Sequence, residues 1–514
     1  MKKLIPFFLL ALLLAGCKTT PTPEIPPANT AAAEPTAPAA TPSAGEVIPP
    51  TPIPTLVNLT ILYTDDEHGW MAGQEEGQGA AELLSLLQTQ HQYGQNEGVI
   101  LISGGDNWTG PAISTWFQGQ GMVEAMNAMG YSASAIGNHE FDFGPAVMQA
   151  RFAEANFPFL AANLRYVDSN AVPTDLGIQP YTIIEAGGIQ VGIIGLSYIG
   201  TPSVTTPEYV APFVFTDYAE AVREFVPQMQ EEGADVIILT THLCSVDLAN
   251  LARDVKDLGI PFIGGGHCHN PFITRAGDTV IAIGGANLAS YAYVDLAYNP
   301  ASGETDILDY DVSSYESKTA DPAVAAIVAD WQARTDAELS TVIGYLEGEI
   351  AQKSPEMQAL ITEAWLWANP NAQVALTNLG GMRTNIPAGE VTLASVVGVM
   401  PFDNTIVQVS LTGAQLREVL DYGTGYLAMG GIHTEGGSWV LNGSGEKIDD
   451  AATYLVLVNS FMYSGGDGYE MLAEYDPNAY QTGIDWRQPV FDWIIDQATT
   501  AANPLDDLIA DLVQ

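Results

Sequence analysis

Short apolar runs alternate with stretches of helical periodicity through the middle of the chain. The apolar runs fall at 57–63, 99–103, 133–137, 191–196, 234–241 and 260–263. Between them, residues 81–91 and 218–232 carry apolar side chains at helical spacing. Alternating strands and helices indicate an α/β fold whose sheet is largely buried. We therefore expect an α/β domain over residues 56–320.

The same pattern resumes after a connecting segment. Residues 321–341 are expected to form a linker helix, because Asp321-Pro322 is a typical helix start. From 342 to 514, strand-like and helical stretches mix again among many glycines. This predicts a second α/β domain that is separate from the first.

The first 55 residues have the layout of a sorting signal and a tether. Two lysines precede an apolar run at 4–14, which is too short to span a bilayer and is typical of a signal peptide. The run ends in Leu14-Ala15-Gly16-Cys17, a bacterial lipobox pattern, which implies cleavage before Cys17 and lipidation of that residue. The alternative is an ordinary signal peptide with a chance cysteine. Residues 18–55 hold eleven of the chain's 32 prolines and predict an extended tether. We expect a protein of the cell envelope whose only membrane contact is this lipid, and Lys18 favours the outer membrane or the surface.

Charge narrows the range of partners. Sixteen Lys and Arg face 61 Asp and Glu, a net charge of −45. This excess argues against a protein that binds nucleic acid by neutralising phosphates, and against a polybasic membrane anchor. If the substrate is an anion, the site must carry local positive charge that overcomes the negative electrostatic potential of the protein. A saline habitat is one possible origin of the acidity, and composition leaves it open.

Polar clusters follow five of the apolar runs directly. They are Asp65-Asp66-Glu67-His68-Gly69, Gly104-Gly105-Asp106, Gly137-Asn138-His139-Glu140-Phe141-Asp142, Thr241-His242 and Gly266-His267-Cys268-His269. Five of the seven histidines lie in these clusters. Ligands of α/β sheets bind outside the carboxyl ends of the strands, so the clusters are expected to converge. Carboxylate oxygen and imidazole nitrogen together suit zinc, manganese or iron. The sequence thus predicts a metal site.

The five clusters, in this order, resemble the motifs of calcineurin-like metallophosphoesterases, and more closely those of the bacterial 5′-nucleotidase family. The resemblance covers nearly the whole first domain. It implies a four-layer metallophosphoesterase β-sandwich flanked by helices, followed by a second α/β domain that binds substrate. It also implies two divalent metal ions, zinc, manganese or similar, about 4 Å apart.

The resemblance assigns roles to nine residues of the first domain. Asp106 bridges the two ions. Asp66, His68 and His269 complete one metal site, and Asn138, His242 and His267 complete the other. His139 is expected to stabilise developing charge or to protonate the leaving group, while Asp142 orients its ring. Asp65, Glu67 and Glu140 are expected to be solvated or to support the ligands.

The second domain carries motifs that resemble the substrate domain of the same family. By this resemblance, Asn378 and Arg383 hold phosphate, Phe402 and Phe461 sandwich a nucleobase, and Asp467 binds the base or ribose. Leu379 stands where the family has a glycine, and Lys353 lies where an arginine is expected. These departures leave the preferred nucleotide open, and the sequence gives no oligomeric state.

Several interpretations therefore remain. The leading one is hydrolysis of extracytoplasmic 5′-nucleotides to nucleoside and phosphate. The alternatives are a 2′,3′-cyclic-nucleotide phosphodiesterase with 3′-nucleotidase activity, a UDP-sugar hydrolase, a sulfur-ester hydrolase, and a surface protein that binds nucleotides or mediates adhesion without turnover. For Cys244 and Cys268, a small buried filler is favoured over a disulfide or a metal-ligating thiol. Trp108 and Trp116 are expected in the core rather than in a cleft.

Overall fold

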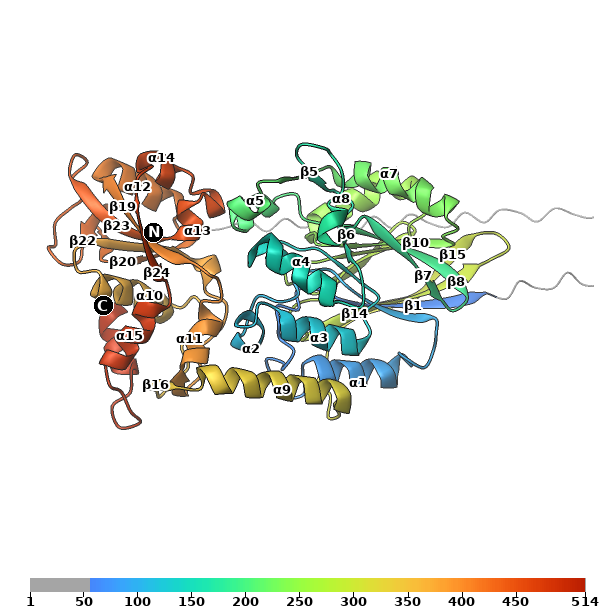
Figure 1. The fold of residues 1–514 in the computed structure, drawn as a ribbon, viewed down its shortest axis with the longest axis horizontal. Coiled ribbons are helices and arrows are strands. Elements are labelled where there is room, and N and C mark those ends of the chain that lie inside the picture. Colours follow the sequence, from blue (N-terminus) through green and yellow to red (C-terminus); the bar gives the residue numbers. More distant parts are fainter. Residues whose placement is uncertain (1–55, 514) are drawn as a thin grey trace, which may run out of the picture. The chain divides into compact units, whose positions relative to one another are not determined.

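The structure is a computed structural model that describes residues 56–513 (Figure 1). The predicted signal peptide, Cys17 and the tether at 18–55 lie outside the described residues. Residues 54–514 belong to one compact unit. Within the described part of the chain, no helix is both long and apolar enough to cross a membrane.

Two sheets form the centre of the first half of the chain. The seven-stranded sheet has the order β15 (Glu304–Ser314), β14 (Ser290–Asn299), β1 (Val57–Thr64), β2 (Val99–Ser103), β3 (Ala133–Ala135), β4 (Phe159–Leu160) and β6 (Ile178–Gln179). The six-stranded sheet has the order β12 (Phe272–Ala276), β13 (Thr279–Ile283), β11 (Phe262–Gly265), β10 (Val236–Thr241), β8 (Ile189–Leu196) and β7 (Tyr181–Ala186). The strands that carry the polar clusters pair in parallel within their own sheet, β1 with β2 and β2 with β3, and β10 with β11.

The two sheets pack face to face and helices cover their outer faces. Strand β1 shows the alternation: Ile61 and Tyr63 lie in the core between the sheets, while Leu62 packs toward the helices. Helices α1 (Ala80–Gln90), α3 (Gln120–Met129), α4 (Gly144–Glu154) and α9 (Pro322–Leu339) cover the seven-stranded sheet. Helices α7 (Tyr218–Glu231) and α8 (Ser245–Asp254) cover the six-stranded sheet (Figure 1). The expectation of a four-layer sandwich flanked by helices is confirmed.

Helix α9 occupies the place of the expected linker. Its N-cap Asp321 accepts hydrogen bonds from the backbone N–H groups of Ala323 and Val324, and a proline fills its first turn. Trp331 is buried against the sandwich and donates its indole N–H to Glu124, 2.9 Å away. The helix thus packs firmly on α1 and α3 before the chain enters its last third.

A third sheet organises the remaining residues. Its order is β20 (Leu427–Gly430), β17 (Val374–Asn378), β23 (Thr453–Asn459), β19 (Thr405–Thr412) and β24 (Tyr480–Asp485). One face packs on α10 (Pro355–Ala368), α11 (Leu393–Val399), α15 (Gln488–Asp496) and α16 (Asp506–Val513). The other packs on α12 (Gly413–Tyr422), α13 (Ser460–Tyr463) and α14 (Met471–Tyr475). Short pairs complete the fold: β16 (Val342–Leu346) with β18 (Gly389–Thr392), β21 (Ile432–Glu435) with β22 (Ser438–Leu441), and β5 (Leu164–Tyr166) with β9 (Phe213–Phe215). This second α/β arrangement is also as expected.

Candidate active site

The polar clusters converge because parallel strands of the two packed sheets end at the same edge. The clusters after β1, β2 and β3 come from one sheet, and those after β10 and β11 come from the other. Within each triplet Asp66–His68–His269 and Asp106–His242–His267, the possible ligand atoms lie within 4.8 Å of one another. The first triplet is the set that the sequence analysis grouped around one ion, and the second combines His242 and His267 with Asp106, the expected bridge. A third triplet, His68–Asp106–His139, meets the same distance.

The backbone at this edge adopts an unusual conformation. Asp66, His68, Asp106, His267 and His269 all have positive φ, between 45° and 71°. A side chain in the left-handed region costs on the order of 1–3 kcal/mol and persists only where the surrounding structure enforces it. Five such residues within one site show that the fold holds these side chains in place at the expense of local stability.

Several atoms at this site that could ligate a metal ion are buried without a hydrogen-bond partner. Among the described residues, Asp66 Oδ1, Asn138 Oδ1 and His242 Nε2 have no hydrogen bond, although His242 Nε2 lies 2.9 Å from Asp106 Oδ2. His68 Nε2 and His269 Nε2 face each other at 3.0 Å. Unpaired buried polar atoms are costly, and a bound cation would satisfy every one of these lone pairs. The residues present therefore fit divalent metal.

The opposite ring nitrogens fix the tautomers that ligation requires. His68 Nδ1 lies 3.0 Å from the carbonyl oxygen of Thr109, and His242 Nδ1 lies 2.9 Å from that of Gly104. A backbone carbonyl only accepts hydrogen bonds, so each Nδ1 carries the proton and donates. When a metal binds, each Nε2 would present its lone pair to the site, which is the usual arrangement of metal-binding histidines.

Two buried glutamates support the ligand loops. Glu140 accepts hydrogen bonds from the backbone N–H groups of Gly137 at 2.6 Å, Asn107 at 2.8 Å and Asp106 at 3.0 Å. Burial and the charge of Asp106 raise its pKa to about 8. Glu67 accepts from Thr64 and other side chains, and burial raises its pKa to about 7. Glu140 supports the ligands as expected.

Glu67 and Asp65 depart from part of the expectation. Both are buried rather than solvated, and Asp65 accepts a hydrogen bond from the backbone N–H of Gly284. The cluster that follows β1 is covered by the surrounding chain, which leaves Asp65 2% and Glu67 0% exposed. Of the two tryptophans, Trp108 lies in the core as expected, whereas Trp116 is 40% exposed and donates to Glu338.

His139 and Asp142 form a close pair beside the triplets. His139 Nδ1 lies 2.7 Å from Asp142 Oδ2, and its Nε2 lies 3.9 Å from Asp106 Oδ2. Burial opposes a charge on His139, but the carboxylates of Asp142 and Asp106 outweigh it and raise the pKa of the imidazole. The ring is therefore suited to carry a proton at Nε2, directed into the site.

Arg383 brings a positive charge to the same place. Its Nη2 lies 3.3 Å from His68 Nε2, and no carboxylate of residues 56–513 forms an ion pair with it. Burial lowers the pKa of this guanidinium, and the nearby charges of Asp106 and Asp142 oppose that shift. Arginine stays protonated even so. A half-buried guanidinium that has no carboxylate partner among residues 56–513 is a binding group for an anion.

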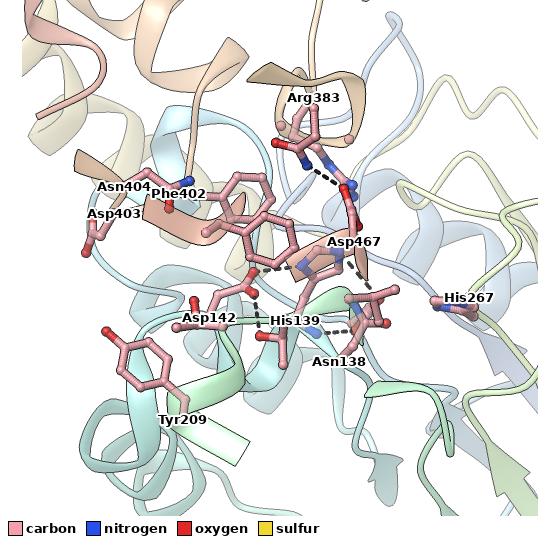
Figure 2. A pocket seen from close by; sticks show the side chains of 18 of the residues that line it. Asn138, His139, Asp142, Tyr209, His267, Arg383, Phe402, Asp403, Asn404 and Asp467 are labelled. Atoms are coloured by element: carbon pink, nitrogen blue, oxygen red, sulfur yellow. Dashed lines mark hydrogen bonds and ion pairs between the residues drawn. The ribbon is translucent and has the colours of Figure 1, made fainter. Parts of the chain in front are cut away.

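A pocket of about 240 Å³ joins the metal-ligand edge to the third sheet (Figure 2). The predicted site residues that line it are Asp106, Asn138, His139, Asp142, His267, His269, Asn378, Arg383, Phe402, Phe461 and Asp467. Asp66, His68 and His242 are buried and do not line it. Phe402 stacks on His139 with ring centroids 5.8 Å apart, and Asn378 donates to Asp467 at 2.8 Å. Every predicted metal, catalytic and substrate residue of the described chain thus lies in or beside one site.

The structure also contains features that the sequence analysis missed. Val204, Thr205, Thr206 and Tyr209 line the pocket, although their Thr- and Pro-rich segment shows no motif. Cys244 and Cys268 form a disulfide with Cα atoms 5.4 Å apart, so the preference for unpaired fillers was wrong. The reason is that both cysteines follow directly on the ends of β10 and β11, which pair with each other.

Comparisons with known proteins find 5′-nucleotidases and related phosphoesterases. Residues 342–474 match the family model "5′-nucleotidase, C-terminal domain". The trifunctional nucleotide phosphoesterase protein YfkN of Bacillus subtilis is 26% identical over 83% of this chain, and the chain spans 33% of that protein's length. The 5′-nucleotidase of Vibrio cholerae is 28% identical over 83% of this chain and 88% of its own. The crystal structure of a 5′-nucleotidase precursor from Thermus thermophilus superposes with a TM-score of 0.74 at 23% identity, over 86% of this chain and 97% of that one.

Fold, site and relatives together define a metal-dependent phosphoric ester hydrolase, built from a four-layer sandwich and a second α/β domain. The chain is similar to 5′-nucleotidases over most of its length.

Proposed function

We propose that this protein hydrolyses extracytoplasmic 5′-nucleotides to nucleoside and phosphate, with two divalent ions at the converging strand ends. One observation carries the proposal. Within residues 56–513, ligand atoms of Asp66, Asn138 and His242 have no hydrogen-bond partner. They lie beside Arg383, a half-buried arginine with no carboxylate partner in the same range, at a pocket lined by Phe402 and Phe461. Cations, phosphate and nucleobase thus each have a complementary surface.

The ligand sets follow the two triplets. Asp66, His68 and His269 would hold one ion, and His242 and His267 the other, with Asp106 between them. The unpaired amide oxygen of Asn138 would complete the second set. Zinc, manganese or a similar ion suits this mixture of oxygen and nitrogen donors. Such ions activate water as a nucleophile and polarise phosphoryl oxygens. The number and identity of the ions are part of this proposal.

The chain's own residues bind and orient the phosphate. The Arg383 guanidinium places two adjacent N–H donors where a phosphate beside the ligand edge would lie, and Asn378 lines the same pocket. Because Arg383 has no carboxylate partner, its charge is available to the substrate. The flat, forked donor group also fixes the orientation of the ester relative to the strand ends.

His139 acts on the leaving oxygen. Asp142 accepts the Nδ1 proton at 2.7 Å, which fixes the ring and directs Nε2 toward the site. The carboxylates of Asp142 and Asp106 raise the pKa of His139, which favours a proton on Nε2. That proton passes to the nucleoside oxygen as the ester bond breaks, which is general acid catalysis.

The nucleoside occupies the other end of the pocket. Phe402 and Phe461 supply aromatic surface for the base, and Asp467 supplies an acceptor for the base or ribose. In the structure Phe402 lies on His139. Base binding therefore places the sugar and its ester oxygen near the acid.

The proposed setting is the cell envelope, with a lipid on Cys17 and a tether at 18–55 holding the enzyme outside the cytoplasm. The disulfide between Cys244 and Cys268 supports this, since such bonds persist in oxidising compartments.

A second candidate is a broader activity on 3′- or cyclic nucleotides. It is favoured by the relative named as a trifunctional nucleotide phosphoesterase, and by Leu379 and Lys353, which depart from the family pattern in the substrate domain.

The test is phosphate release by the full chain in detergent, with manganese or zinc. The substrates are AMP, UMP, UDP-glucose, 3′-AMP and 2′,3′-cyclic AMP, and metal content is measured on the same samples. We expect metal-dependent release from AMP and UMP that His139→Ala abolishes while metal stays bound. Release from the 3′ and cyclic substrates alone establishes the second candidate, and no release from any nucleotide by the metal-loaded enzyme refutes both.

A further inference from the structure

The segment between α5 (Thr201–Val204) and α6 (Pro207–Val210) touches the acid–base pair, although no sequence pattern marks it. We propose that Thr205 is a positioning residue, which completes a chain of hydrogen bonds from Thr205 through Asp142 to His139. The inference rests on the proposed function insofar as His139 protonates the leaving oxygen.

The carboxylate of Asp142 is held at both oxygens. Oδ2 accepts from His139 Nδ1 at 2.7 Å, the dashed line between these two labelled residues in Figure 2. Oδ1 accepts from the Thr205 hydroxyl at 3.3 Å. The terminal torsion of an aspartate is broad and soft, so a single hydrogen bond does not fix the carboxylate plane. A second hydrogen bond, donated by the Thr205 hydroxyl from a different part of the chain, fixes that plane. The orientation of the His139 ring then follows from that of Asp142.

Thr205 is well placed for this role because its own backbone is fixed. Its N–H donates to the carbonyl oxygen of Thr201, and Pro207 begins α6 two residues later. Only 2% of Thr205 is exposed. The hydroxyl therefore meets Asp142 from a rigid turn between two short helices.

The same segment is close to the substrate-binding residues. Helix α5 contacts the short turn η5 (Gly466–Gly468), which carries Asp467. Val204 and Thr205 line the pocket together with Asp142 and Asp467. The segment thus connects the acid–base pair with the part of the pocket that is proposed to hold the nucleoside.

The test compares Thr205→Val, Thr205→Ala and Thr205→Ser in the full metal-loaded chain. With AMP we expect kcat to fall about tenfold in the Val and Ala variants, the lower end of the loss when an outer hydrogen-bond partner is removed. KM and metal content should stay within twofold, and Ser should recover at least half of kcat. Ser203→Ala is the matched control, because Ser203 lies on the preceding helix α5 and its exposed hydroxyl donates to the carbonyl oxygen of Gly200.

A second substrate separates positioning from folding. 4-Nitrophenyl phosphate releases a stable anion that needs no proton, so its kcat should change less than twofold in Thr205→Val. Equal losses on both substrates, a rise in KM alone, or wild-type kcat on AMP would each overturn the proposal. If the wild-type enzyme releases no phosphate from AMP, the proposed function fails instead. If Thr205→Val is unstable, Thr205→Ala is compared with Ser at the same temperature.

Discussion

Glu140 offers a sharp test of how the fold supports its metal site. Its two carboxylate oxygens accept three backbone N–H groups, two on the loop after β2 and one after β3. The first loop carries Asp106 and the second carries Asn138. Glu140→Gln keeps the shape of the side chain and removes its charge. The change therefore tests the hydrogen bonds rather than the packing.

The size of the effect follows from the state of the carboxyl group. In the metal-free protein, burial and the charge of Asp106 hold the pKa of Glu140 at about 8, so the group is largely neutral at pH 7 and resembles glutamine. A cation on Asp106 offsets that charge and lets Glu140 ionise. Its hydrogen bonds then become charge-assisted, and two or three of them gain about 1 kcal/mol each. Glutamine forgoes that gain, a loss of about 2 kcal/mol, or roughly 30-fold in metal affinity.

The assay is competition for manganese or zinc against a chelator at pH 7, with melting temperature recorded on metal-free and metal-loaded samples. We expect weaker metal binding and a lower melting temperature only in the loaded state. The exposed Glu97→Gln is the matched control. If Glu140→Gln binds metal within twofold of wild type, or destabilises both states equally, the reasoning about Glu140 is wrong.

Four further results are expected. His139→Ala should lower kcat on AMP by roughly 10²–10⁴-fold with metal content unchanged, and loss of metal would show that the ring is a ligand. Arg383→Ala should raise KM for AMP by about 10–100-fold and Arg383→Lys by less, since a charge-assisted bond contributes about 1.5–3 kcal/mol; an unchanged KM in both would remove Arg383 from the phosphate site. Burial opposes a charge on His242, but Asp106, Asp66 and Glu140 raise its pKa to about 10, so the metal-free ring is protonated at pH 7. Metal binding must therefore release a proton and strengthen as pH rises; calorimetry that gives the same heat in buffers of different ionisation enthalpy would contradict this. Replacing Cys244 and Cys268 together by Ser should lower the free energy of unfolding by about 3 kcal/mol, given their sequence separation of 24. Under reducing conditions, where the wild type also lacks the disulfide, the double variant and the wild type should be equally stable.

Much of the site could be predicted because its residues follow strands that are buried on both faces. Such strands appear as continuous apolar runs, and 99–103 coincides with β2 (Val99–Ser103). The metal-ligating clusters come directly after these runs, so their convergence follows from parallel pairing alone. The run at 260–263 was less accurate, since β11 begins at Phe262 and continues through Gly264 and Gly265. A Cβ on Gly264 would meet the ring of Tyr63, so glycine is required there for close packing of the two sheets.

The features that escaped prediction depend on contacts between distant segments. Thr205 and Asp142 are 63 residues apart, and only the packed fold brings the hydroxyl to the carboxylate. Glu140 bonds to backbone N–H groups, which carry no side-chain signature. The disulfide, in contrast, could have been predicted from the sequence. The small number of cysteines favoured two unpaired residues, and this outweighed their position after two strands. Cys244 and Cys268 follow the ends of neighbouring strands, and that placement alone favours a bond.

The net charge of −45 and an anionic substrate are reconciled within the site itself. Asp66 and Asp106 carry two negative charges at the strand ends, and Arg383 and the protonated His242 carry two positive ones, so these four groups give the metal-free site no net attraction for phosphate. Two divalent ions would add four positive charges at that point. The carboxylates that offset Arg383 in the metal-free protein are thus the groups that would hold the ions which attract the substrate. Because the surrounding surface repels anions at long range, only this local positive charge draws phosphate in. Charge therefore favours one order of binding, metal first and nucleotide second.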